Sequence, residues 1–308
     1  MVKKILKSIV DSRLVQLSLA LARKFHPPGF EGLSLFAVAR FFVEGLQKGA
    51  LTTRAAAISF RFFLAVFPVI IMLLSLIPLI PVPDFQENLF ASVRDFFPGD
   101  TFTLVEETVG DLLNKSHNTV FSIGFILSLI YASNSVNAIL LGFNGSYNLE
   151  SRGNPMVLRL VSLVLMILLG LFIVIAVALI MFSGMAFEKA LDLGWLDQDS
   201  VILLQIAKWF LSVFLIYGTI TILYNIGDFQ YKKWKTFSAG STLTTILFIL
   251  TSVAFAWFVN NFSSYNKLYG SLGTFLLLLI WLNLNSTILL IGFELNTSIA
   301  KAKSDLEK

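Results

Sequence analysis

Six long apolar stretches dominate this chain and limit what it can fold into. Each is longer than the roughly 20 residues that an α-helix needs to cross the hydrocarbon core of a bilayer. Backbone polar groups cannot remain unpaired in lipid, so repeated stretches of this length predict membrane-spanning helices. The predicted spans are residues 55–77, 119–141, 157–182, 201–226, 237–260 and 270–295.

Composition supports the same conclusion. Of the 308 residues, 56% are hydrophobic and only 14% are charged, whereas a soluble domain usually carries about a quarter charged residues. The expected fold class is an all-α, polytopic integral membrane bundle of six transmembrane helices. N-terminal amphipathic helices and a helical external loop are expected to complete it.

The loops between the spans alternate in charge. Lys and Arg predominate in residues 1–54, in the turn with Lys232, Lys233 and Lys235, and in the tail with Lys301, Lys303 and Lys308. Acidic residues predominate in the loops 79–118 and 183–200. Because basic loops stay on the cytoplasmic side, both termini are expected inside a bacterial inner membrane, as six spans require. The first apolar run begins too late, and is too long, for a cleavable signal peptide.

The predicted organisation is one membrane domain with short additions. Residues 1–54 should hold an amphipathic helix at 1–24, lying in the lipid interface or packed on the cytoplasmic face, and a second helix at about 33–47. Residues 55–296 form the six-helix domain, and residues 297–308 form a cytoplasmic tail. In the external loop 79–118, Thr103 and Glu106 fit a capping box, which predicts a helix after Pro98.

Polar residues follow one face of four predicted spans. At 100° per residue, each set occupies a narrow arc of its helix. Such stripes either hydrogen-bond between helices or line a hydrated path for a substrate, and the residues alone leave both interpretations open. The sets are Arg61, Pro68 and Ser75 on the first span; Asn134, Asn137, Asn144 and Asn148 on the second; Gln205, Lys208, Ser212 and Thr219 on the fourth; and Asn283, Thr287, Glu294 and Ser298 on the sixth.

Arg61 and Glu294 are the most informative charges within the spans. Both are predicted near the cytoplasmic boundary, and an inward-facing arginine is costly without a partner. We expect them to pair or to share a polar cluster; the alternative is that Arg61 reaches the lipid phosphates and Glu294 lies at the interface. Lys208 should extend toward the outer surface. Pro68 could kink the first helix and form a hinge.

Catalytic and metal-binding patterns are absent from the sequence. The only histidines, His26 and His117, are predicted on opposite sides of the membrane, and there is no cysteine. No cluster has metal-ligand spacing, and no Ser/His/Asp set can assemble at one depth. We therefore expect no enzyme, no cofactor and no metal.

Several ordered segments resemble the YihY/BrkB family of bacterial inner-membrane proteins, once labelled ribonuclease BN. They include residues 54–60 followed by Phe67-Pro68, residues 137–152, and Trp234-Lys235 with Ala239-Gly240. The strongest is Tyr269-Gly270-Ser271-Leu272-Gly273, then Trp281-Leu282, then Gly292-Phe293-Glu294-Leu295-Asn296, with Phe293 where the family pattern has Ala. Arg61 also departs from the pattern, which more often has an aromatic or polar residue there.

The resemblance implies six spans with both termini inside, but it carries no mechanism. We expect a transporter-like protein that moves or exports a lipid or small solute for the cell envelope. A non-transporting envelope scaffold is the alternative, and a ribonuclease is the least favoured function. Membrane lipids are the expected partners, without nucleic acid, and a homo-oligomer or an envelope complex is left open. The candidate path residues are Arg61, Pro68, Asn134, Asn137, Asn144, Lys208, Asn283 and Glu294, and the motif residues are Tyr269, Gly270, Gly273, Trp281, Gly292 and Asn296.

Overall fold

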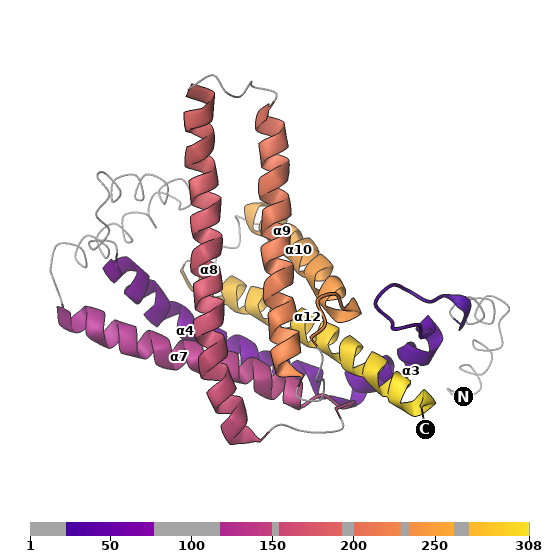
Figure 1. Cartoon of the computed structure of the whole chain (residues 1–308). Helices are drawn as coiled ribbons and strands as arrows, with labels where there is room; N and C mark the ends of the chain where they lie inside the picture. The colour runs from indigo at the N-terminus through magenta and orange to yellow at the C-terminus, as the bar shows by residue number, and fades with distance from the viewer. Residues whose placement is uncertain are drawn as a thin grey trace. The chain divides into compact units, whose positions relative to one another are not determined.

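The regular structure described in the computed structural model is helical. The model describes residues 23–76, 118–149, 154–192, 200–228, 234–261 and 271–307. Within these residues the helices are α3 (Leu35–Lys48), α4 (Leu51–Leu76), α7 (Asn118–Asn144), α8 (Pro155–Asp192), α9 (Ser200–Gly227), α10 (Ala239–Asn261) and α12 (Ser271–Leu306) (Figure 1). The all-α fold class is confirmed.

Six of these helices are long and apolar enough to cross a membrane. Their apolar segments match the six predicted spans in order and approximate position, so the chain is a multi-span membrane protein. The segments are Leu51–Val69, Ile123–Asn144, Pro155–Phe172, Ile206–Gly227, Ala239–Val259 and Phe275–Leu306. The predicted amphipathic helix at 1–24, apart from its last two residues, and the predicted helix after Pro98 lie outside the described residues.

The chain divides into two compact units, and the divisions fall inside α4 and α7. The smaller unit runs from Phe60 to Ser135, and the larger unit comprises the chain up to Ser59 and from Val136 onward. In the smaller unit, the hydroxyl of Ser135 on α7 donates to the carbonyl of Arg61 on α4 at 2.9 Å. This bond joins the two helices at that unit's edge.

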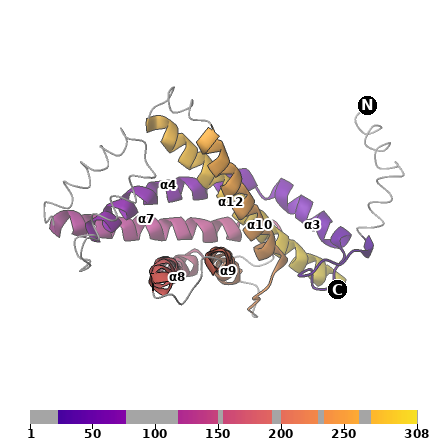
Figure 2. The same cartoon turned by 90° about the horizontal axis from the view of Figure 1, so that it is seen from above.

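The larger unit is built around α12. Helix α10 packs along α12, and α3 packs against it nearer the C-terminus, while α9 contacts both α10 and α8 (Figure 2). Helices α8 and α9 lie side by side and antiparallel (Figure 1). They expose large apolar side chains such as Ile167, Val174 and Phe210. A helix that is apolar on all faces is expected to meet lipid or other helices, as these do.

Helix α3 follows a short irregular segment, residues 25–34, and its start is encoded locally. The hydroxyl of Ser34 accepts a hydrogen bond from the amide of Ala37, which is an N-cap, and Gly49 ends the helix. The predicted helix at about 33–47 is thus found at Leu35–Lys48. The turn into α4 passes through Ala50, whose φ is 46°.

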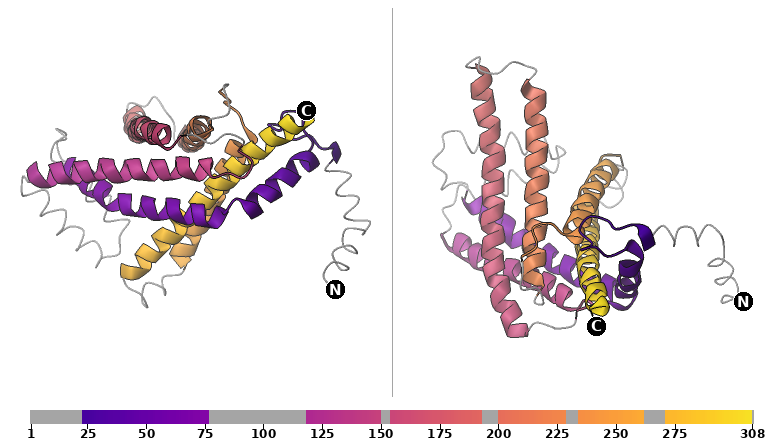
Figure 3. Two further views of the ribbon diagram at one scale, coloured as in Figure 1. Left: turned by 90° about the horizontal axis from the view of Figure 1, so that it is seen from below. Right: turned by 45° about the vertical axis from the view of Figure 1, so that its right-hand side comes forward.

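One apolar cluster packs the segment 25–34 and α3 against two membrane helices. It joins the segment 25–34 and α3 to α10 and the last turns of α12, which lie beside them in Figure 3. Because this cluster buries Ile299 and Ala302, α12 continues to Leu306 through most of the predicted tail 297–308. Its members are Phe30, Leu33, Val38, Ala239, Leu295, Ile299 and Ala302.

Candidate functional site: a buried ion pair among α3, α4, α7 and α12

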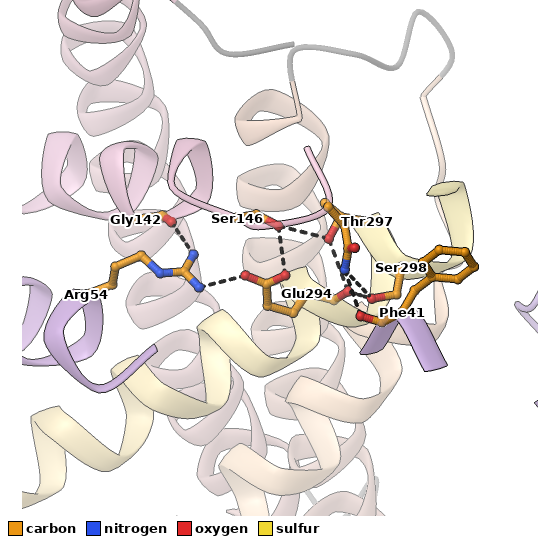
Figure 4. Close-up of polar contacts among 8 residues, drawn as sticks. Phe41, Arg54, Gly142, Ser146, Glu294, Thr297 and Ser298 are labelled. Carbon is orange, nitrogen blue, oxygen red and sulfur yellow. Dashed lines mark hydrogen bonds and ion pairs between the residues drawn. The ribbon is translucent and has the colours of Figure 1, made fainter. Parts of the chain in front are cut away.

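A buried ion pair connects the first and last membrane helices. Nη2 of Arg54, in the first turn of α4, lies 2.6 Å from Oε1 of Glu294 on α12 (Figure 4). The side chain of Glu294 is 0% exposed and that of Arg54 is 11% exposed. Arg54 also donates through Nη1 to the carbonyl of Gly142 on α7 at 2.7 Å. Three helices therefore converge on one guanidinium.

The second carboxylate oxygen of Glu294 is also bonded. The hydroxyl of Ser146, just after α7, donates to Oε2 at 2.8 Å and lies 3.1 Å from Oγ1 of Thr297 (Figure 4). Thr297 in turn donates to the carbonyl of Glu294 at 3.1 Å. A buried charge needs both a counter-charge and hydrogen bonds to be tolerated, and Glu294 has both.

Asn148 extends this polar cluster to α3. Its amide Nδ2 donates to the carbonyl of Phe41 and to the hydroxyl of Ser298, both at 3.0 Å. Ser298 donates to the carbonyl of Glu294 at 2.5 Å. We call Arg54, Ser146, Asn148, Glu294, Thr297 and Ser298 the polar cluster.

Two glycines let α3 approach the polar cluster. A Cβ atom at Gly45 would lie 2.8 Å from Nδ2 of Asn148 and 2.9 Å from Oε2 of Glu294. At Gly49 it would lie 2.8 Å from Nη2 of Arg54. A larger residue at either position would push α3 away from the ion pair, so the spacing of these two glycines is part of the site.

The residues on either side of Glu294 hold α12 to its other neighbours. Gly292 faces α9 and α10, where a Cβ atom would lie 1.9 Å from Oγ1 of Thr244. The ring of Phe293 stacks on Phe143 of α7, with centroids 4.1 Å apart. Oδ1 of Asn296 accepts from the amide of Gly240 at 2.8 Å. Through these residues the motif 292–296 contacts two further helices, α9 and α10, and makes a second contact with α7.

The structure gives Glu294 another cation besides the Arg61 that was expected to pair or cluster with it. The cation on Glu294 is Arg54, while Arg61 belongs to the smaller unit, where its carbonyl accepts from Ser135. Arg54 and Arg61 are seven residues apart on α4, so they share a helix face and differ by two turns. The smaller unit also contains Pro68, inside α4, and Asn134, half-buried on α7.

The other predicted path residues in the larger unit are spread over several helices. Asn283 donates to the hydroxyl of Ser59 at 3.4 Å, and Asn137 and Asn144 are half-buried on α7. Lys208 is half-buried on α9. On the α9 stripe, the hydroxyls of Ser212 and Thr219 donate to carbonyls of their own helix, and not to a neighbouring helix.

The remaining motif residues have packing roles where they are described. Trp281 has its ring near those of Phe248 and Phe255, with centroids 6.3 and 6.4 Å away, and Gly273 is buried. Tyr269 and Gly270 lie outside the described residues. Among the residues that the structure describes, no three His, Asp or Glu side chains are grouped so that they could hold a metal ion.

Arg54, Ser146 and Thr297 are the residues of the polar cluster that sequence reasoning missed; Thr297 falls in the predicted tail 297–308. Arg54 was assigned to the basic N-terminal region because it precedes the apolar run, and Ser146 lies beyond the predicted end of its span. The seven-residue spacing from Arg54 to Arg61 was the available signal for Arg54. Nothing in the local sequence distinguishes Ser146 from an ordinary loop serine.

Comparison with known proteins relates this chain to a ribonuclease-like protein and to UPF0761 membrane proteins. It is 26% identical over 251 residues to the ribonuclease-like protein YfkH of Bacillus subtilis, covering 82% of this chain and 90% of that protein. It is 24% identical over 269 residues to a UPF0761 membrane protein of Aggregatibacter aphrophilus, covering 86% and 92%. A UPF0761 membrane protein of Histophilus somni is also 24% identical, over 271 residues, covering 86% and 91%.

No solved structure matches the chain. The family model described as virulence factor BrkB, by contrast, matches residues 42–308, which include every described span and the whole polar cluster. The chain is therefore a member of the BrkB virulence factor family.

Proposed function

We propose that this protein is a transporter-like component of the bacterial inner membrane that moves or exports a lipid or small solute for the cell envelope. The observation that carries the proposal is the Arg54–Glu294 ion pair. Ionisable side chains within membrane spans are rare because they are costly, and they usually mark a substrate or ion pathway. Both residues lie within apolar membrane segments, and Glu294 is fully buried.

The surroundings of the pair support this function. The polar cluster continues from Glu294 through Ser146 and Asn148 to the backbone of α3. A bundle held together by packing alone could use apolar residues at these positions, often at no loss of stability. In this proposal both termini face the cytoplasm, as the alternation of loop charge requires.

Native mass spectrometry of the gently extracted protein tests the proposal. Wild type is compared with Glu294→Gln, with Phe293→Leu, and with Glu44→Gln. Phe293→Leu disturbs packing beside Glu294 without changing charge, and Glu44 is a surface acid of α3 paired with Arg40 and Lys48. A defined lipid or solute retained by wild type and both controls, but lost from Glu294→Gln under conditions where that variant is still folded, supports transport. Loss from Phe293→Leu as well would assign the effect to destabilisation.

The same measurement can favour the alternatives. If all four proteins carry the same mixture of bulk phospholipids, the polar cluster is structural and an envelope scaffold becomes the better description. The name ribonuclease-like belongs to YfkH. For this chain, a ribonuclease function would replace the transport proposal only if RNA-cleaving activity co-purified with the wild-type protein and a point substitution abolished that activity.

A further inference from the structure

A second polar site lies where α9 ends and α10 begins, away from the Arg54–Glu294 pair. A cavity of about 240 Å³ opens between the end of α9, the turn before α10, the segment 25–34 and the last part of α12. Pockets for whole drug-sized ligands are usually about 300–1,000 Å³, so this one suits a head group rather than a complete lipid. Its polar lining is Glu31, Asn225, Asp228, Lys235, Ser238 and Asn296.

Two lysines converge on the carboxylate of Glu31: Lys235, which lines the cavity with it, and Lys303, which reaches Glu31 from outside the lining. Nζ of Lys235 donates to one oxygen of Glu31, and Nζ of Lys303 on α12 donates to the other at 2.8 Å. The lysine side chains are 33% and 47% exposed, respectively. The carboxylate of Glu31, with two acceptor oxygens on one carbon, therefore already lies between the two ammonium groups.

The backbone that presents Glu31 is strained. Glu31 has a φ of 53°, a left-handed conformation that is unfavourable for residues with a Cβ atom, and it lies between Gly29 and Gly32, whose φ values are 85° and 80°. Gly29 lies close to Ala239, where a Cβ atom would be 3.0 Å from the amide nitrogen. The buried Phe30 and Leu33 on either side keep this left-handed turn in place, so it presents the Glu31 side chain at the cavity.

Neutral polar side chains of the cavity fix the backbone around Lys235. Asn225 accepts from the backbone amide of Lys235 at 2.7 Å and donates to its carbonyl at 2.9 Å. Ser238 and Asn296 bond to each other at 3.1 Å at the start of α10. Lys235 is thus presented from a fixed backbone, which is the preorganisation that a binding site requires.

We propose that this cavity binds a monoanionic phosphodiester head group, and that Glu31 is an internal competitor that occupies Lys235 and Lys303 when no ligand is bound. Once Glu31 is displaced, the charges of Lys235, Lys303 and Asp228, counted over the described residues around the cavity, sum to one positive charge. A monoanionic phosphodiester neutralises that charge, whereas a dianionic phosphomonoester would exceed it. The proposal deepens the transport function by naming a substrate class, and only its relevance to transport rests on that function.

Equilibrium binding to the full-length protein in detergent micelles tests the proposal without any transport step. The probes are dihexanoyl phosphatidylglycerol, inorganic phosphate and dihexanoyl glycerol, which lacks phosphate. Trp234 is adjacent to Lys235 and 59% exposed, so its fluorescence is the readout, and Trp234→Phe identifies the signal that belongs to it. Because no turnover is measured, failure of binding here is distinguishable from failure of the transport proposal.

The expected results follow from competition. Glu31→Gln should bind dihexanoyl phosphatidylglycerol about tenfold more tightly than wild type, because the internal competitor is gone. Lys235→Gln and Lys303→Gln should each weaken binding by about tenfold or more, and Lys303→Arg should largely restore it. Glu44→Gln and Lys301→Gln remove surface charges outside the cavity and should leave the Kd unchanged.

Other outcomes would overturn the proposal. Inorganic phosphate is not a diester and is largely dianionic at neutral pH, so its binding as tightly as the lipid would overturn the preference for a monoanionic phosphodiester. Equal binding of dihexanoyl glycerol would overturn it, since phosphate would not matter. An unchanged Kd in Glu31→Gln, or equal weakening by Lys301→Gln and Lys303→Gln, would also overturn it.

Discussion

The guanidinium of Arg54 lies 2.6 Å from the carboxylate of Glu294, although 240 positions separate the two residues in the chain. The pair closes the larger unit by joining the start of α4 to the C-terminal half of α12. It also brings in α7 through Gly142 and Ser146, so the pair has structural consequences that can be measured apart from transport.

Glu294→Gln should destabilise the protein strongly, because it leaves the charge of Arg54 buried without a partner. Breaking a buried pair in this way costs about 3–5 kcal/mol. Thermal unfolding in detergent, followed by loss of the monodisperse gel-filtration peak, measures the effect. The double variant Arg54→Met/Glu294→Leu removes both charges and should regain most of the loss. Equal destabilisation of single and double variants would contradict a role for the unpaired charge.

Gly292→Ala should separate α12 from α9 and α10. The new methyl group would meet Oγ1 of Thr244 at 1.9 Å and the hydroxyl of Tyr224 at 2.5 Å, which are themselves 2.6 Å apart. Overpacking of this kind costs about 1–3 kcal/mol. Gly170→Ala on α8 is the matched control, because a Cβ atom there meets nothing within 4 Å. It should unfold at or above the wild-type temperature, and a similar loss in both variants would refute the steric explanation.

The stabilisation of the segment 25–34 by Glu31 should decrease at acidic pH. Burial alone would raise the pKa of Glu31, but hydrogen bonds and charge from Lys235 and Lys303 outweigh it and hold the pKa below its ordinary value. A carboxyl group with a lowered pKa contributes stability that is complete at neutral pH and disappears as the pH falls through that lowered pKa.

Hydrogen exchange of the Phe30 and Leu33 amides measures this effect, since both are hydrogen-bonded within the segment. After correction for intrinsic rates, protection should be constant from pH 7 to about pH 5 and fall below the ordinary carboxyl range, near pH 4. Glu31→Gln should show low protection throughout that range. An identical pH profile in both proteins would mean that another group controls the segment.

Membrane orientation can be tested cleanly because the chain has no cysteine. We expect Asp305→Cys, near the C-terminus, to react with a membrane-impermeant maleimide only after the inner membrane is permeabilised. Ser92→Cys, in the acidic loop 79–118, should react in spheroplasts with an intact inner membrane. The reverse pattern would invert the topology deduced from loop charge.

The spans could be predicted from the sequence because length and hydropathy alone determine them. The 30 or so ångströms of hydrocarbon set a minimum length, and every stretch that met it is a helix in the structure. The face of Glu294 was also predictable, because helical periodicity places Ser298 beside it. Periodicity cannot decide between residues two turns apart, so the choice of Arg54 over Arg61 depended on how α4 packs against α12.

The less visible parts of the site depend on contacts between distant segments. Gly45 and Gly49 resemble ordinary helix glycines until Asn148, Arg54 and Glu294 are placed against them. Glu31 has no local feature that predicts two lysine partners more than 200 residues later in the chain. Such residues become recognisable only when the helices that carry their partners have been brought together.

The motif 292–296 also restricts how α12 can move. Within five residues it is bonded or packed to α4 through Glu294, to α7 through Phe293, and to α9 and α10 through Gly292 and Asn296. Helix α12 therefore cannot slide or rotate by itself without breaking an ion pair, a ring stack and a backbone hydrogen bond at once. If these helices move relative to one another, the parts bonded to the motif 292–296 should move together. Displacement should then occur in the parts of the helices that extend beyond the motif.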